Sequence, residues 1–290
     1  MIDYWIQILI IILIYLILTM SLNLLIGYLG TLPICHAAFY GIGAYTNVLL
    51  MIKLNIDFIL SLCLSIVFTS LLSLVISVLA LRLKEDSFIL ATISFQIVVF
   101  ELLYNMTELT SGASGISGIP RPILFGVSTT SLYSFCIFSG IITFICGLLV
   151  YWLIASPFGR VLRTIRDDES AALALGKNTG SFKITIFAFA SGFAAIAGAL
   201  WAGFVGYIDP TTFTVTESIF ILSMVIIGGS GTFSGSVVGA IFMVIVPEFL
   251  RFIQIPDAIA ANLKQIISGV LIILFMRFRP NGLLGKYKFN

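Results

Sequence analysis

The residues best suited to chemistry in this sequence are a few polar side chains that lie inside long apolar runs. At membrane depth a polar group is costly unless it faces the interior of a helix bundle or a water-filled cavity. Such residues are therefore candidates for lining a solute pathway. They are Asn23, His36, Asn47, Gln96 and Glu101.

These side chains offer hydrogen bonding and proton transfer, and little else. His36 is the only histidine, and a metal site is not expected because one histidine lacks partner ligands. Two interpretations of His36 stay open, a hydrogen bond that packs two helices and a contact with solute. Glu101 is a possible proton carrier, but no charged partner is evident at its depth. No apolar segment combines a nucleophile, a base and an acid, so we predict that the chain is not an enzyme.

The composition places these residues in a membrane. Apolar residues make up 60% of the 290 and charged residues 10%, against about 25% charged in a typical soluble domain. The net charge of +2 is too small to indicate binding to nucleic acid. The chain is predicted to be a polytopic, all-α bundle of about eight to ten spans that forms one transmembrane domain, residues 1–290. Nine candidate segments are 5–27, 34–52, 57–82, 87–106, 131–155, 183–207, 217–230, 234–250 and 261–278.

The positive charges predict the orientation, because Lys and Arg in short loops favour the cytoplasmic side. One arrangement puts eleven of the fifteen on that side, leaving only Lys53, Arg121, Arg251 and Lys264 outside. It places the N-terminus outside and the C-terminus in the cytoplasm. The loop 156–183 is then cytoplasmic, and the Gly-rich loop 107–130 is external.

The cytoplasmic loop 156–183 has the pattern of two short helices. Arg160, Arg163 and Arg166 recur every third residue as a basic stripe, with apolar residues on another face. Acidic residues open the second helix, and Gly176 ends it. Such a pair can fill a groove on a partner protein. The alternative is an interfacial element whose arginines bind anionic lipid.

A glycine-rich stretch separates the two short candidate segments, 217–230 and 234–250. Interrupted helices are tolerated at membrane depth only inside protein or beside a water-filled cavity, so this region is predicted to be re-entrant or a tight hairpin. Two roles are open for its glycines, close helix packing and a gate hinge. The residues are Gly228, Gly229, Gly231, Gly235 and Gly239.

Several strings along the chain resemble the LivM-type permeases of bacterial branched-chain amino acid importers, which are ATP-binding-cassette (ABC) transporters. They are Gly27-Tyr-Leu-Gly30, His36-Ala-Ala-Phe-Tyr-Gly-Ile-Gly-Ala-Tyr45, Gly112-Ala-Ser-Gly-Ile-Ser-Gly-Ile-Pro120, Tyr207-Ile-Asp-Pro210, Ile227-Gly-Gly-Ser-Gly-Thr232 and the run Phe158 to Gly176. In that run, Ser170-Ala171-Ala172 and Gly176 are similar to the E-A-A-x-x-x-G core of importer permeases. Their common order and topological positions make the resemblance specific.

The resemblance implies that 156–183 is the coupling loop on which a cytoplasmic ATPase docks. The residues implied in coupling are Phe158, Gly159, Arg160, Arg163, Arg166, Asp168, Glu169, Ala171, Ala172 and Gly176. The external loop is implied to dock a soluble binding protein through Ser114, Gly115, Gly118, Pro120 and Arg121. The implied partners are a LivH-like second permease, LivG- and LivF-like ATP-binding subunits and the binding protein, in the lipid of a bacterial inner membrane.

The sequence departs from the family where Gly30-Thr-Leu-Pro-Ile-Cys-His36 replaces the common G-Q-L-S-L-G-H. Thr31 therefore joins the pathway candidates, and the identity of the solute is in doubt. Urea or a short amide is the alternative substrate, and an ion-coupled carrier is the alternative class. No phosphate-binding G-x-x-x-x-G-K-[ST] motif is present, so ATP and Mg²⁺ are expected on the partner ATPases and no cofactor or metal on this chain.

Overall fold

The computed structural model describes residues 2–83, 85–124, 127–128, 131–251, 257–279 and 282–285. The long helices are α1 (Ile2–Asn23), which continues as the π-helix η1 (Leu24–Leu29), α2 (His36–Lys53), α3 (Phe58–Arg82), α4 (Glu85–Asn105), α6 (Leu132–Ala155), α9 (Thr179–Val205), α10 (Val215–Gly228), α11 (Phe233–Arg251) and α12 (Asp257–Phe278). The short helices are α5 (Thr107–Thr110), η2 (Gly112–Ser114), α7 (Pro157–Asp167), α8 (Glu169–Ala174) and η3 (Pro210–Phe213). Strand β1 (Ile116–Ser117) pairs with β4 (Tyr207–Ile208), and β2 (Ile123–Leu124) pairs with β3 (Val127–Ser128), both antiparallel.

The predicted helical membrane fold is confirmed, because each of the nine apolar segments contains a long helix. By length and composition, five helices of the described chain can cross a membrane, namely Ile2–Leu29, Phe58–Leu79, Asp86–Asn105, Leu132–Ala155 and Thr179–Val205. The count of nine complete crossings is not confirmed. The 14 residues of α10 extend only about 21 Å, less than the roughly 30 Å of a bilayer core. The loop predicted at 156–183 ends earlier than predicted, because Asn178 caps α9 from Thr179 onward.

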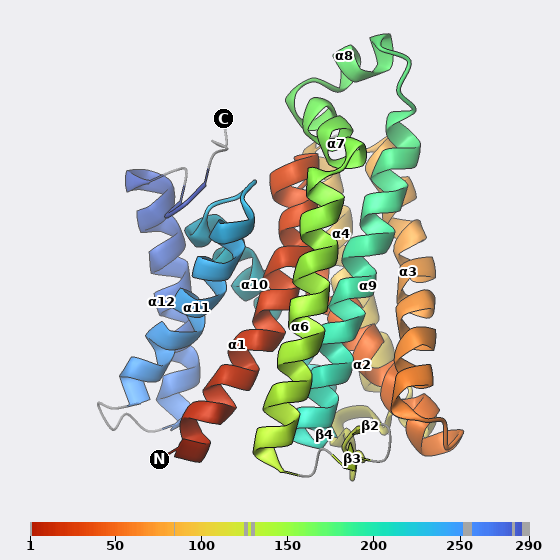
Figure 1. The fold of residues 1–290 in the computed structure, drawn as a ribbon, viewed down its shortest axis with the longest axis vertical. Coiled ribbons are helices and arrows are strands. Elements are labelled where there is room, and N and C mark those ends of the chain that lie inside the picture. Colours follow the sequence, from red (N-terminus) through yellow and green to blue (C-terminus); the bar gives the residue numbers. More distant parts are fainter. Residues whose placement is uncertain are drawn as a thin grey trace.

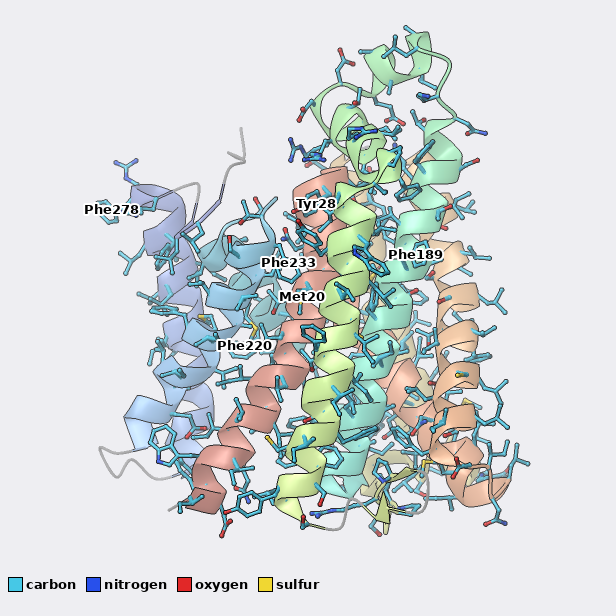
Figure 2. All side chains as sticks on the ribbon, viewed as in Figure 1. Met20, Tyr28, Phe189, Phe220, Phe233 and Phe278 are labelled. Carbon is cyan, nitrogen blue, oxygen red and sulfur yellow. The ribbon has the colours of Figure 1, made fainter. Side chains whose placement is uncertain are left out.

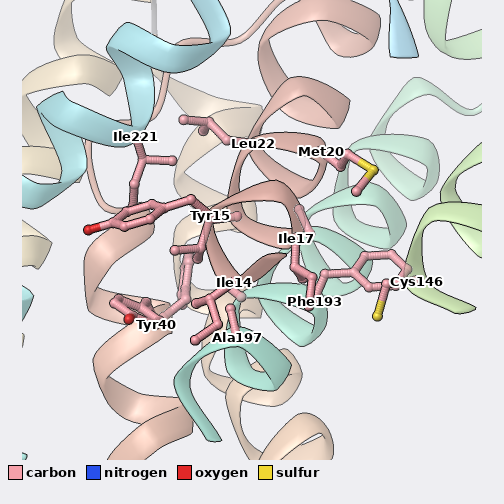
Figure 3. Close-up of a cluster of buried hydrophobic side chains, with 14 of the residues drawn as sticks. Ile14, Tyr15, Ile17, Met20, Leu22, Tyr40, Cys146, Phe193, Ala197 and Ile221 are labelled. Carbon is pink, nitrogen blue, oxygen red and sulfur yellow. The ribbon is translucent and has the colours of Figure 1, made fainter. Parts of the chain in front are cut away.

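The centre of the bundle is built from α1, α2 and α9. In the apolar stretches of α1 and α9, 72% and 67% of the residues are buried, against 28%, 22% and 33% in α3, α4 and α6. Figure 3 shows Ile14, Ile17, Tyr40 and Ala197 of these three helices meeting in the core. The outer helices α3, α4 and α6 therefore present much of their surface to the surroundings. Figure 1 shows α7 and α8 beyond one end of this bundle, and the N-terminal residues of α1 at the other end.

Small residues allow the central helices to approach closely. A Cβ on Gly198 of α9 would lie 2.2 Å from the carbonyl oxygen of Tyr40 in α2. Likewise, a Cβ on Gly43 of α2 would lie 2.2 Å from the Cα of Ala195. Close backbone contact between small residues is a main source of helix association in membranes, where lipid removes most of the hydrophobic drive.

Helix α3 separates its polar and apolar residues by side. A serine or threonine recurs every fourth residue along it and is buried, which places the hydroxyl groups on one face of the helix. Helix α3 packs on α2 and α9: the Asn47 amide of α2 donates to Ser61 of this face at 2.9 Å, and Ser70, which lies outside the series, donates to the Ala188 carbonyl of α9 at 2.9 Å. The outward face carries exposed apolar residues such as Val67 and Leu71. The inward hydroxyls are Ser61, Ser65, Thr69, Ser73 and Ser77.

Helices α10 and α11 form a tight hairpin around the predicted glycine break. A Cβ on Gly228 would lie 2.0 Å from the carbonyl oxygen of Gly235, and one on Gly239 would lie 1.9 Å from that of Met224. The turn itself needs left-handed backbone at Gly229 and Gly231, with φ of 108° and 77°. These glycines therefore let two short helices pack backbone against backbone.

The hairpin supplies a stability test. We expect Gly239→Ala to force α10 and α11 apart and to lower the melting temperature of the detergent-solubilised protein by several degrees. Gly269→Ala on α12 is the matched control, because a Cβ at Gly269 meets nothing within 4 Å. Thermal unfolding followed by size-exclusion chromatography checks both variants. Equal melting temperatures would contradict the packing role.

Candidate functional site

The candidate site is the helix pair α7–α8, which projects from the bundle between α6 and α9 (Figure 1). Ser156 caps α7, its hydroxyl accepting from the Gly159 N–H at 3.4 Å, and Pro157 occupies the first turn. Proline is favoured there because its ring presets φ and its missing N–H is not needed. Leu162 and Ile165 are buried against the bundle, which fixes the helix on its support.

The three arginines of α7 do not form one free stripe. The Arg163 guanidinium donates to the carbonyl groups of Gly159 and Ile154, at 3.2 and 3.3 Å. The Arg166 guanidinium donates to the Gly27 carbonyl in η1 at 2.7 Å and also pairs with Asp167. Arg160 is exposed. Two of the predicted coupling arginines therefore bind the helix ends beneath α7, which leaves them occupied by protein carbonyls.

Helix α8 is held at both ends. The Asp168 carboxylate accepts from the Ala171 N–H at 3.1 Å and caps the start. At the C-terminal end, the Lys177 N–H donates to the Ala172 carbonyl and the Gly176 N–H donates to the Leu173 carbonyl. Gly176 has φ 73°. This is the Schellman arrangement, which requires a residue in the left-handed region. The predicted stop at Gly176 thus has a defined backbone cause.

A salt bridge ties α8 to the membrane helix α9. Lys183 Nζ lies 2.7 Å from Glu169 Oε1. Partial burial alone raises the pKa of Glu169, but hydrogen bonds from Lys183 and Thr179 and the Lys183 charge outweigh it and lower the pKa below its usual value. The bridge therefore contributes stability at neutral pH, and this contribution is lost as the pH falls through the depressed pKa of Glu169.

The outer surface of α8 is apolar and unpaired within the described chain. Leu173 is 55% exposed and Leu175 72% exposed, whereas Ala172 is buried inside the element. Ala171, beside Leu173, is also exposed. Sequence reasoning did not single out the two leucines. Their signal was present, since they are the two large apolar residues between Arg166 and Asn178.

The α7–α8 pair contacts the α10–α11 turn through the end of α1. Gly27, which accepts from Arg166, lies in η1 so close to the turn that a Cβ would be 2.1 Å from the Gly231 nitrogen. Gly30, at φ 84°, leaves room for the Arg166 side chain, because a Cβ there would lie 2.6 Å from its Cγ. Tyr28, labelled in Figure 2, lies at this end of α1. The Gly27-Tyr-Leu-Gly30 string therefore forms the contact between α7 and the hairpin.

Asn23 binds the hairpin directly. Its side-chain nitrogen donates to the Thr232 carbonyl at 2.9 Å and to the Ser236 hydroxyl at 2.8 Å, and its oxygen accepts from the Gly231 N–H at 3.0 Å. From the other side, the N–H groups of Leu283 and Leu284 donate to the last carbonyls of α10. Asn23 is buried, and these bonds give partners to backbone N–H and C=O groups at the break between α10 and α11.

The start of α2 is a second polar cluster inside the bundle. The segment 30–35 returns from the end of η1 into the protein, so that His36 Nε2 lies 2.7 Å from the hydroxyl of Ser21. The Ala37 N–H donates to the Ser218 hydroxyl at 2.9 Å, and the Ala38 N–H donates to Gln96 Oε1 at 2.7 Å. Gln96 also donates to the Phe213 carbonyl at 2.7 Å. Ser218 was missed from the sequence, although it is a polar residue in an apolar run.

The remaining pathway candidates are not gathered into one site. The Thr31 hydroxyl donates to the Leu25 carbonyl at 3.4 Å, and the Asn47 amide donates to the buried Ser61 hydroxyl at 2.9 Å. Glu101 is exposed on the outward face of α4. Among the described residues, no group of three His, Cys, Asp or Glu side chains is placed to hold a metal ion.

The loop predicted to be external is fixed to the bundle by the pairing of β1 with β4. Gly115, at φ 65°, packs so tightly that a Cβ would lie 2.3 Å from the Ile208 carbonyl oxygen, and the Tyr207 hydroxyl donates to the Ser114 carbonyl at 3.1 Å. Of the predicted docking residues, Ser114, Gly118 and Pro120 are exposed, Gly115 is buried and Arg121 is half-buried. The loop thus presents a shaped surface at the end opposite α7 and α8.

Long apolar helices, polar groups paired at helix breaks and a projecting helix pair define a polytopic helical membrane permease. The chain belongs to the family of permease components of branched-chain amino acid transport systems, whose family model matches residues 4–276. The LivM resemblance seen in the sequence motifs is thereby confirmed.

Three relatives illustrate the breadth of the family. The chain is 32% identical to the high-affinity branched-chain amino acid transport permease LivM of Escherichia coli, over 93% of this chain and 68% of the relative. It is 28% identical to a probable LivM of Methanocaldococcus jannaschii, over 77% and 68%. It is 29% identical to the autoinducer 2 import permease LsrC of Salmonella paratyphi B, over 57% and 48%. No solved structure matches the chain.

Asn23 provides a test of the connection between α1 and the hairpin. We expect Asn23→Leu, which keeps the volume but forms none of the three hydrogen bonds, to destabilise the protein by about 1–3 kcal/mol per buried group left unpaired. Asn47→Leu, which loses one such bond to Ser61, is the control. Thermal unfolding in detergent compares the two variants, and a larger loss for Asn47→Leu would refute the assignment.

Proposed function

We propose that this chain is the permease subunit of an ABC importer that carries branched-chain amino acids into the cytoplasm by alternating access. Separate ATPase subunits hold ATP and Mg²⁺ and supply the energy, and this chain binds no cofactor. The observation that carries the proposal is the α7–α8 pair, which projects from the bundle, exposes Leu173 and Leu175, and is bonded to η1 through Arg166.

The proposed mechanism is mechanical. ATPase closure moves α7, and the move reaches η1 through the Arg166 bond to Gly27. Because η1 packs on the turn at Gly231, the α10–α11 hairpin follows. Two packed arrangements of this hairpin, open to opposite sides, would constitute alternating access.

The proposed assembly contains a second, LivH-like permease, LivG- and LivF-like ATPases and a soluble binding protein outside. The chain lies in a bacterial inner membrane with its N-terminus outside and its C-terminus in the cytoplasm. Its α7–α8 end then faces the ATPases, and the exposed residues Ser114, Gly118 and Pro120 face the binding protein. Coupling residues buried in the element, such as Ala172, would preserve its shape.

Uptake into reconstituted vesicles tests the function. We expect radiolabelled leucine, isoleucine and valine to accumulate only with the partner subunits, the binding protein and hydrolysable ATP. Urea uptake without leucine uptake would establish the alternative substrate on the same scaffold. Accumulation driven by an ion gradient without the ATPases would overturn the proposal in favour of a secondary carrier.

Gly176 tests the coupling loop. We expect Gly176→Val to abolish uptake while the protein remains inserted, because a β-branched residue resists the left-handed backbone that ends α8. Gly206→Val is a matched control, since Gly206 has φ 74° and likewise open surroundings at the other end of α9. Uptake and co-purification of the ATPases are both measured. Normal co-purification in the Gly176 variant would count against the coupling role.

Leu175 tests the docking surface itself. We expect Leu175→Glu to reduce ATPase co-purification at least tenfold, because an exposed apolar contact is replaced by a charge that must be desolvated on docking. The control is Leu54→Glu, which changes a similarly exposed leucine outside α7–α8. A pull-down from detergent extracts compares them. Undiminished recovery with Leu175→Glu would show that this surface does not bind the ATPase.

A further inference from the structure

Helix α4 carries polar residues on two opposite faces. Its inner face holds Gln96, which binds the start of α2 and the Phe213 carbonyl. Its outward face carries four exposed polar side chains that lie within a narrow arc, since three of them are seven residues apart and the fourth follows one turn later. We call Ser87, Ser94, Glu101 and Asn105 the α4 polar stripe.

The stripe is exceptional among the outer helices of the described chain. On α3, every serine and threonine from 58 to 79 is turned inward or half-buried, and the exposed residues are apolar apart from Cys63. On α6, the exposed residues between 132 and 155 are aliphatic or aromatic, for example Phe144. The chain therefore arranges α3 and α6 for contact with lipid, and α4 departs from that arrangement.

The Glu101 carboxylate also differs from the glutamates of α10 and α11 in its hydrogen-bond partner. Glu217 and Glu248 accept hydrogen bonds from Tyr15 and Tyr4 of α1. Glu101 accepts from Asn105 of its own helix, at 2.9 Å, and both side chains are exposed. Neither ion pair among the described residues involves Glu101. A charged side chain in contact with hydrocarbon is costly, so this pair requires water or a polar partner.

The α4 polar stripe runs from near the end of α4 through its middle, so the need for water or a polar partner continues into the membrane. Glu101 lies four residues from the end of α4, which is about 6 Å along the axis. Ser94 lies near the middle, and its hydroxyl donates to the Leu90 carbonyl at 2.9 Å, so lipid alone would tolerate it. The ionisable pair therefore carries the argument, and Ser94 shows the direction in which the polar face continues.

We propose that the α4 polar stripe lines the water-filled solute pathway, on the face that this chain presents to its second permease subunit. This inference rests on the proposed function, because a pathway shared by two permeases requires the importer assembly. Glu101 then places a negative charge near the outer mouth, where it favours the ammonium group of a zwitterionic amino acid. The residues buried in the bundle, such as Asn23 and Gln96, hold the helices and do not contact solute.

Thiol accessibility in the assembled transporter tests the inference. Ser94→Cys is introduced into a chain whose four cysteines are replaced, and vesicles are treated with a charged methanethiosulfonate reagent that reacts with thiolates in water. Leu71→Cys on α3 and Ile141→Cys on α6 are the controls, since both lie near the middle of exposed faces. We expect Ser94→Cys to react at least tenfold faster than either control and to be slowed by added leucine.

Reaction of Ser94→Cys at the rate of the controls would overturn the inference. It would show that lipid or a dry protein contact, and not water, covers the stripe. Uptake by the same vesicles separates this outcome from failure of the proposed function. Slow labelling with normal leucine uptake would refute the stripe alone. Fast labelling without uptake of any branched-chain amino acid would support a water-filled pathway and refute the proposed substrate.

Discussion

The structure depends on one constraint, that backbone N–H and C=O groups at a helix break inside a membrane must find partners within the protein. Two breaks in this chain are satisfied by side chains distant in sequence. The first N–H groups of α2 are bound by Ser218 and Gln96, and the α10–α11 turn is bound by Asn23. The costly polar residues of the core are thus used to hold interrupted helices in place.

In the proposed function, this constraint also explains how the α7–α8 pair can act on the membrane helices. Asn23 belongs to α1, and α1 continues directly into η1, whose Gly27 carbonyl accepts from Arg166. Each contact in the series is a hydrogen bond or a glycine-tight backbone contact, which leaves little slack. Displacement of α7 would therefore be transmitted to the hairpin, and no charge needs to cross the bundle.

On the outer surface the same cost of unpaired polar groups in lipid leaves apolar side chains facing outward. Lipid accepts the apolar faces of α3 and α6, and the buried hydroxyl groups of α3 are turned toward the bundle. Helix α4 has polar residues on both faces because it must bind the start of α2 on one side and, as we propose, meet water on the other. A helix with 22% of its apolar stretch buried is well placed for that double role.

The sequence by itself determined the class of fold, the family and the two short helices of the loop between α6 and α9. Apolar runs of membrane length, the Ser-Ala-Ala-x-x-x-Gly spacing and the capping residues of α7 and α8 are local signals, and each is written in consecutive residues. Only the tertiary structure decided which face each polar residue occupies. Arg163 and Arg166 looked like a free stripe because a period of three says nothing about the carbonyls beneath it. Asn23 and Gln96 were predicted to line the pathway, and their hydrogen-bond partners Gly231 and Ala38 could not be predicted because they lie far along the chain and meet them only when the helices pack.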